Sequence, residues 1–151
     1  MTQSSARDRL EQALARIADP AGEGRRVCLT VYAEAARAAA GAADARAKLG
    51  ISLGPLDGAI VSIKDLFDVA GEVTRAGSRI LAEEGTPAVA DAMVVRRLRG
   101  AGAVIVAKTN MTEFAFHSLG TNPHFGTPGN PVHRVVGGAS PARASRRAIE
   151  R

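Results

Sequence analysis

Aromatic side chains are scarce in this sequence of 151 residues: they make up 3%, and tryptophan is absent. Most of the packing must therefore come from alanine, valine, isoleucine and leucine. A chain of this length fits one domain with a real hydrophobic core, since domains hold roughly 100–200 residues. The scarcity also argues against the aromatic platform on which single-stranded nucleic acids usually stack.

Cysteine is rare and long apolar runs are absent. The single Cys28 excludes an internal disulfide, which is typical of a reducing, cytoplasmic setting. No apolar run approaches the roughly 18 residues needed to cross a bilayer. The first 20 residues mix charges with Leu, Ala and Ile and lack the apolar core of a signal peptide. We therefore expect a cytoplasmic protein with no membrane partner.

The net charge of +5 does not indicate a nucleic-acid partner, because most of it belongs to the tail. From residue 134 onward the chain has five arginines and a single acid, so this segment alone carries +4. Proteins that bind nucleic acid usually show a basic face on the body of a domain. The body of this sequence is almost balanced in charge, and we expect no nucleic-acid partner.

Apolar spacing predicts two helices at the start of the chain. Leucine and isoleucine recur at helical spacing over residues 5–18. Residues 29–49 are rich in alanine, the best helix former, and predict a second helix that lies flat against the body.

Two buried strands follow, with a helix between them. Residues 59–63 are rich in β-branched side chains, and residues 103–107 form a second apolar run. Asp91 is expected to cap the intervening helix. Strand, helix and strand make a βαβ-like unit, in which parallel pairing is the default. The predicted fold class is α/β, with a mixed, mainly parallel sheet flanked by helices.

Two familiar kinds of site do not fit the motifs present. Gly100 and Gly102 end a helix and open a strand, whereas a dinucleotide-binding glycine motif follows a strand and opens a helix. The three histidines are spread through loop without any established metal-ligand spacing, even with Glu113 counted. The sequence therefore predicts neither a metal nor a cofactor.

The stretch "AIVSIKDLFD" ends an apolar strand in Lys64 and follows it at once with an acid. A buried ammonium there must reach water, pair with Asp65 or a more distant acid, or lose its proton. The first two outcomes are structural and the third is catalytic. Both interpretations remain open on these residues alone.

Two neighbouring features favour the catalytic interpretation. The second strand also ends in a polar cluster, Lys108-Thr109-Asn110, and ligand and catalytic groups collect at the carboxyl ends of parallel strands. The loop Gly137-Gly138-Ala139-Ser140 would let backbone N–H groups approach a reacting centre and can present a hydroxyl.

Five segments of the chain resemble, in order, those of the amidase signature family. They read "GPLDGAIVSIKDLFDVAG", "TRAGSRIL", "DAMVVRRLRGAGAVIVAKTNMTEFAF", "GTNPHFGTPGNP" and "VVGGAS". The resemblance covers residues 54–140 and, more loosely, begins at residue 8. It implies the N-terminal part of a hydrolase that cleaves the C–N bonds of amides. The same family includes the glutaminase-type subunit of tRNA-dependent amidotransferases, so ammonia release is an adjacent activity.

The resemblance also implies a Ser–cis-Ser–Lys triad. The family's lysine lies in the motif that "SIKD" matches, so Lys64 would be that residue, kept neutral by burial among apolar strand residues. The family's bridging serine follows the glycine pair directly; this chain has Ala139 there, and Ser140 one place later is the candidate. Backbone N–H groups at Gly137 and Gly138 would bind the substrate and its oxyanion.

The implied substrate is a small-molecule amide. Met111, with Phe114 and Phe116, would line an apolar pocket for it, or the three would anchor a short helix in the core. Their spacing fits both interpretations.

Downstream of the glycine pair the chain departs from the family. The family continues with small residues into a buried helix, whereas this chain reads "SPARASRRAIER", and no second glycine-serine motif for the nucleophile occurs. We expect a truncated or frameshifted chain, inactive alone, whose partner is a complementing C-terminal fragment. The alternative is a natural non-catalytic interaction module that uses its basic tail. The expected parts are a helical region (1–52), the N-terminal part of an amidase domain (53–140) and an atypical basic tail (141–151).

Overall fold

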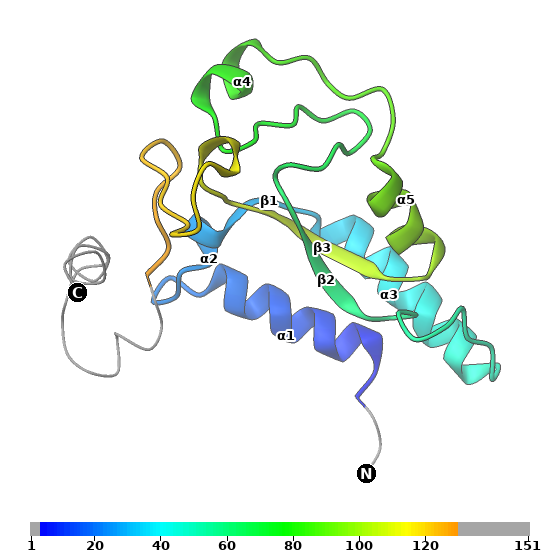
Figure 1. Ribbon diagram of the computed structural model, residues 1–151. Coiled ribbons are helices and arrows are strands. Elements are labelled where there is room, and N and C mark those ends of the chain that lie inside the picture. The colour runs from blue at the N-terminus through cyan, green and yellow to red at the C-terminus, as the bar shows by residue number, and fades with distance from the viewer. Residues whose placement is uncertain (1–3, 130–151) are drawn as a thin grey trace.

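The computed structural model describes residues 4–129, and Figure 1 shows a small sheet with helices on both sides of it. Along the chain the elements are α1 (Ala6–Ala18), α2 (Gly24–Val27), β1 (Cys28–Val31), α3 (Ala33–Lys48), β2 (Ile60–Lys64), α4 (Arg79–Glu84), α5 (Met93–Gly100), β3 (Val104–Thr109) and the 3₁₀ turn η1 (Glu113–Ala115). The predicted α/β class is confirmed. No helix in the described part of the chain is both long enough and apolar enough to cross a membrane. The division at residues 52 and 140 stays a prediction.

The sheet has the strand order β1-β3-β2, so β3 is central. β2 pairs with β3 in parallel, with Lys64 opposite Thr109, as the βαβ-like pattern predicts. β1 pairs with β3 in the antiparallel sense, with Val31 opposite Ala107. The sheet is therefore mixed, and the polar clusters that end β2 and β3 lie at the same edge.

The prediction of one helix over residues 29–49 is wrong at its beginning. Cys28–Val31 forms β1, and α3 starts only at Ala33. The neighbouring strand holds the junction between them, since the N–H of Tyr32 donates to the carbonyl of Val106 at 2.9 Å. A pairing partner this distant in sequence outweighs the helical preference of the alanines that follow.

α1 confirms the helix predicted over residues 5–18. The Ser5 side chain accepts the N–H of Asp8 at 3.0 Å, and the Asp8 carboxylate accepts the N–H of Ser5 at 3.3 Å, which makes a capping box. Asp44 of α3 accepts the N–H of Ala6 at 2.7 Å. The start of α1 is therefore fixed against α3.

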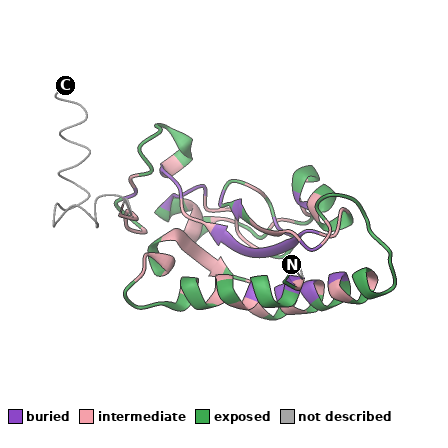
Figure 2. Cartoon of the chain, turned by 90° about the horizontal axis from the view of Figure 1, so that it is seen from below, coloured by how far each residue is buried: buried purple, intermediate pink, exposed green. Residues whose placement is uncertain are grey.

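One face of the sheet packs against α1 and α3. Alanine at three buried positions of α3 lets the helix approach the sheet closely. The buried residues of this core are Ala6, Leu10, Ala36, Ala40, Ala43, Val104, Val106 and Ala107. β3 contributes to it as the most buried strand, seen in the middle of Figure 2.

The other face of the sheet packs against α5 and the segment after β2. Val95 of α5 is fully buried and belongs to a second apolar cluster with Ile63, Val69 and Ile105. Together the two clusters cover both faces of β3, which explains why its apolar run is nearly continuous.

The predicted cap of α5 is wrong by one residue. Ala92 is the N-cap residue and makes no side-chain cap. The Asp91 carboxylate instead accepts the N–H of Ala70 at 2.9 Å and a guanidinium N–H of Arg99 at 2.7 Å. Asp91 therefore joins the start of α5 to the loop after β2.

Candidate active site

The side chains at the end of β2 alternate between solvent and core. Ser62 and Lys64 are exposed, whereas Ile63 and Asp65 are buried. Successive side chains of a strand point to opposite faces, and this order agrees with the pleat. It places the amine of Lys64 and the carboxylate of Asp65, neighbours in sequence, on different sides of the sheet.

The Lys64 side chain borders a surface hollow of about 460 Å³ at the carboxyl ends of the parallel strands. Its lining is mostly polar and consists of Ser62, Lys64, Thr109, Asn110, Met111, Thr112, His117, Ser118 and Gly120. An open sheet binds its ligands outside this edge. The hollow is therefore the candidate active site.

The expected burial of Lys64 is wrong. The side chain is exposed, and among the described residues it makes no ion pair. Asp65 pairs instead with Lys108, whose Nζ lies 3.8 Å from Asp65 Oδ1. The expectation treats every side chain of an apolar strand as buried, whereas only alternate ones face the core here.

Met111 lies at the junction of hollow and core. Its side chain is 4% exposed and its carbonyl accepts an N–H of the Asn122 amide at 2.7 Å. Phe114 and Phe116 are 61% and 89% exposed, so neither lines this hollow nor anchors a core helix. The expected short helix is reduced to η1, because Phe114 and Ala115 have positive φ of 51° and 56°.

Two asparagines hold the loops around the hollow. The Asn110 amide donates to the carbonyls of Arg26 (3.0 Å) and Gly126 (2.8 Å). Asn122, 1% exposed, also accepts two backbone N–H groups with its side-chain oxygen. The sequence points to Asn110 through its strand end, whereas Asn122 is not predicted. The signal for Asn122 is a turn-rich stretch, where an asparagine side chain often bonds to nearby backbone.

A buried polar cluster that the sequence does not predict lies behind the hollow. Lys108 Nζ is 3.6 Å from Glu72 Oε2, which accepts the O–H of Tyr32 at 2.8 Å. Burial raises the pKa of the Asp65 carboxyl above its ordinary value, and the Lys108 ammonium opposes that rise. Burial and the bond to Glu72 raise the pKa of Tyr32. Lys108, rather than Lys64, is therefore the buried lysine.

Some predicted site residues lie outside the described residues. Gly137, Gly138, Ala139 and Ser140 all follow residue 129, so their distance from Lys64 stays a prediction. Within residues 4–129 no group of three or more His, Cys, Asp and Glu side chains could hold a metal ion.

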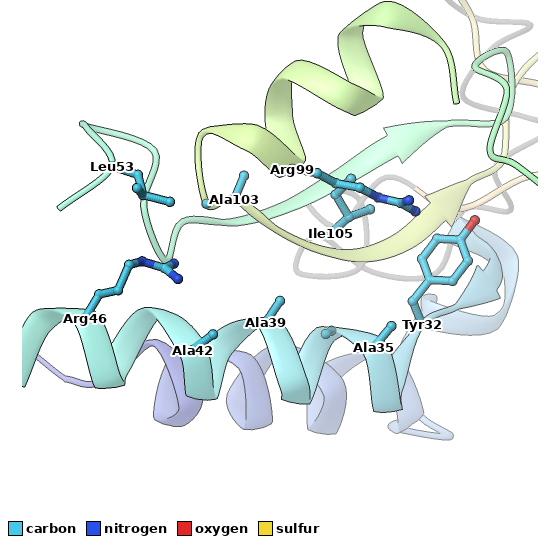
Figure 3. Close-up of a pocket in the computed structure, with 11 residues that line it drawn as sticks. Tyr32, Ala35, Ala39, Ala42, Arg46, Leu53, Arg99, Ala103 and Ile105 are labelled. Carbon is cyan, nitrogen blue, oxygen red and sulfur yellow. The ribbon is translucent and has the colours of Figure 1, made fainter. Parts of the chain in front are cut away.

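A second hollow, of about 400 Å³, lies between α3 and β3 (Figure 3). Alanines of α3 line one side of it and face Ile105. Its polar side chains already have partners: Arg46 and Arg99 each bind an aspartate, and Tyr32 donates to Glu72. This hollow offers packing surface and no free reactive group, so the hollow at Lys64 is the better candidate.

Comparison with known proteins decides the family. The Amidase family model matches residues 9–145, which is most of the chain. The chain belongs to the amidase family. It is 47% identical over 144 residues to a glutamyl-tRNA(Gln) amidotransferase subunit of Anaeromyxobacter dehalogenans (strain 2CP-C). It is 44% identical over 140 residues to the 1-carboxybiuret hydrolase subunit AtzE of Pseudomonas sp. (strain ADP).

Solved structures agree with this amidase-family assignment. A structure of an s-triazine catabolic enzyme in an inhibitor-bound complex superimposes with a TM-score of 0.76 at 43% identity, over 86% of this chain and 28% of that chain. The match to the two curated relatives covers 93% and 91% of this chain but 28% and 30% of theirs. The amidase-family chain therefore spans less than a third of the length of the relatives it matches.

Proposed function

We propose that this chain supplies the lysine of an amide hydrolase with a Ser–cis-Ser–Lys triad, and that Lys64 is its proton acceptor. The observation that carries the proposal is the position of Lys64. Lys64 lines a polar hollow at the carboxyl ends of two parallel strands, in the motif that matches the family's lysine. A proton acceptor needs an amine that reaches the reacting groups, and the exposed side chain provides one.

In the proposed reaction a serine attacks the amide carbonyl and forms an acyl-enzyme. Its proton passes through a bridging serine to Lys64, and then to the leaving nitrogen as the C–N bond breaks. Ser140 is our candidate for the bridging serine. The backbone N–H groups of Gly137 and Gly138 are our candidates for binding the oxyanion. Water then hydrolyses the acyl-enzyme. Met111, at the hollow, is our candidate for an apolar contact to the substrate.

The nucleophile is the part of this machinery that the 151 residues do not include, since no glycine-serine motif follows Ser140. We propose that it comes from a complementing polypeptide that corresponds to the rest of the amidase domain. That polypeptide would also cover the hollow, and removal of water favours an uncharged amine. We expect residues 1–151 alone to hydrolyse no amide.

The proposed substrate is a small-molecule amide, and the proposed location is the cytoplasm. The name of one relative, 1-carboxybiuret hydrolase subunit AtzE, supports a small nitrogen-rich amide. The name of the other, which denotes part of an amidotransferase, supports release of ammonia for transfer. The unpaired Cys28 supports a reducing compartment.

Two chimeras test the proposal. The first joins residues 1–129 of this chain to the remainder of the 1-carboxybiuret hydrolase subunit, and the second joins residues 1–145 in the same way. Both are prepared and assayed for 1-carboxybiuret hydrolysis like the intact hydrolase, beside the chain alone. We expect hydrolysis by the first chimera and none by the chain.

The second chimera tests Ser140 separately. Hydrolysis by it, lost on Ser140→Ala, would support the bridging role despite Ala139. An active first chimera together with an inactive second chimera would overturn the assignment of Ser140. The assignment of Lys64 would then stay in place. A folded first chimera without activity would contradict the proposed function.

A further inference from the structure

A buried ion cluster joins three strand ends behind the hollow. Lys108 of β3 has a side chain that is 1% exposed, and Asp65 after β2 is fully buried. Glu72, from the loop after β2, and Tyr32, directly after β1, complete the cluster. β2 and β3 run side by side in Figure 1, and Tyr32 adds the end of β1. The cluster therefore links every strand of the described sheet.

The cluster is held by charge more than by hydrogen bonds. Lys108 Nζ lies 3.8 Å from Asp65 and 3.6 Å from Glu72, and within residues 4–129 neither Nζ nor the Asp65 carboxylate has a hydrogen-bond partner. A buried charge without compensation is strongly unfavourable, so the cation and the two carboxylates depend on one another. Removal of the cation takes away the strongest charge partner of the Asp65 carboxylate, which then keeps only the smaller effects of Arg75 and of the nearby backbone N–H groups of Gly77 and Arg75.

An irregularity in β3 places Lys108 on this face. The register shifts between Val61 and Ser62, which lie opposite Ile105 and Ala107, so Val106 is an extra residue in β3. Such a bulge turns the following side chains to the other face. Lys108 therefore lies beside Ile63, on the face of β2 that also carries Asp65.

The position of Asp65 sets that of Lys64. Two backbone hydrogen bonds join Asp65 to its neighbours: its N–H donates to the carbonyl of Thr109 at 2.9 Å, and its carbonyl accepts the N–H of Ala76 at 2.8 Å. Lys108 draws the Asp65 carboxylate inward. Because successive side chains of a strand point to opposite faces, the Lys64 side chain then points outward, toward the hollow. An Asp65 that turned toward water would rotate the strand end and move the amine with it.

We propose that Lys108 is a positioning residue: by holding Asp65 on the inner face of β2, it fixes the strand end and aims the Lys64 amine into the hollow. The inference rests on the proposed role of Lys64 in proton transfer. Lys108 itself never contacts the reacting atoms and acts only through Asp65.

The lysine content of the chain makes this testable by amine labelling. The sequence has three lysines: Lys48 is exposed at the end of α3, Lys64 borders the hollow and Lys108 is buried. The full chain is treated briefly with an N-hydroxysuccinimide acetate, and acetylation of each lysine is measured by mass spectrometry of peptides. The ratio of the acetylation rate of Lys64 to that of Lys48 reports how accessible the Lys64 amine is to the reagent.

The test variant is Lys108→Met with Asp65→Asn, which removes both buried charges at nearly constant volume. The matched control is Arg46→Met with Asp57→Asn, which removes an ion pair near the start of β2. We expect the labelling ratio to rise in the test variant, as the amine moves away from the side chains that line the hollow, and to stay unchanged in the control; the rise is modest because Lys64 is already exposed. The single variant Asp65→Asn leaves Lys108 beside Glu72, so it keeps the fold and should raise the ratio in the same direction.

Unchanged labelling in both Asp65 variants would overturn the positioning role. An equal rise in the control would also overturn it, because general loosening would then be the cause. The labelling needs no enzymatic activity, so its failure is distinct from a failure of the proposed function, which the chimeras decide.

Discussion

The side-chain amide of Asn122 donates a hydrogen bond of 2.8 Å to the carbonyl of Gly77, 45 residues earlier in the chain. A second N–H of the same amide binds the carbonyl of Met111, which lines the hollow. One buried side chain thus joins the loop before α4 to the rim of the candidate active site.

Replacement of Asn122 by alanine should destabilise the protein. It leaves the carbonyls of Gly77 and Met111 without these partners in a buried place, which costs about 2–4 kcal/mol of unfolding free energy. Urea unfolding followed by circular dichroism measures the loss. The control is Thr121→Ala, which removes an exposed hydrogen bond between the Thr121 hydroxyl and His117 and should change stability by at most about 0.5 kcal/mol. Equal losses in the two variants would contradict the role of Asn122.

Gly77 should tolerate alanine less well than Gly71. Both have positive φ, +70° and +82°, so both substitutions carry backbone strain of roughly 1–2 kcal/mol. At Gly77 the new Cβ would also lie 2.7 Å from the Met111 carbonyl oxygen, whereas at Gly71 nothing lies within 4 Å. We expect Gly77→Ala to cost at least about 1 kcal/mol more in urea unfolding. A smaller loss of unfolding free energy in Gly77→Ala than in Gly71→Ala would contradict this prediction. It would show that the loops move to accommodate the new Cβ.

The ion pair between α1 and α3 should make stability depend on pH in the acid range. Hydrogen bonds from Arg37, at 2.9 and 3.0 Å, lower the pKa of Glu11 from 4.5 to about 2. Since the folded-state pKa is the lower one, the stabilisation is fully present above pH 4.5 and is lost as pH falls through about 2. Glu11→Gln should therefore lower the thermal midpoint at pH 6 and leave it near wild type at pH 2.

The control for that effect is Glu83→Gln, at an exposed pair with Arg79 in the short helix α4. Exposed pairs of this kind contribute little, so its midpoint should match wild type at both pH values. A difference between Glu11→Gln and wild type that persists at pH 2 would contradict the ionic origin of the effect.

The strands that carry the site could be predicted from sequence, and the third strand could not. Residues 59–63 and 103–107 are apolar runs rich in β-branched residues, bounded by glycine, so each is recognisable by itself. Cys28–Val31 is four residues long and leads into an alanine-rich helix, and its strand character depends on β3. A distant partner of this kind leaves no local pattern.

The same limit explains the exchange of roles between the two strand-end lysines. Period-two alternation predicts which residues share a face, but it does not say which face is covered at a strand end. The extra residue at Val106 further turns Lys108 inward, and nothing in "AVIVAKTN" marks it. The position of Lys64 at the edge of the sheet was predictable, and its exposure was not.

The most direct test of the account is the rate of hydrolysis by the first chimera when Lys64 is replaced by methionine. Loss of a proton acceptor should reduce kcat by about 10²–10⁴-fold, with the fold unchanged because Lys64 makes no ion pair among the described residues. The matched variant Lys48→Met, at the exposed end of α3, should keep the activity of the chimera. A Lys64→Met chimera as active as the Lys48→Met chimera would contradict the central claim.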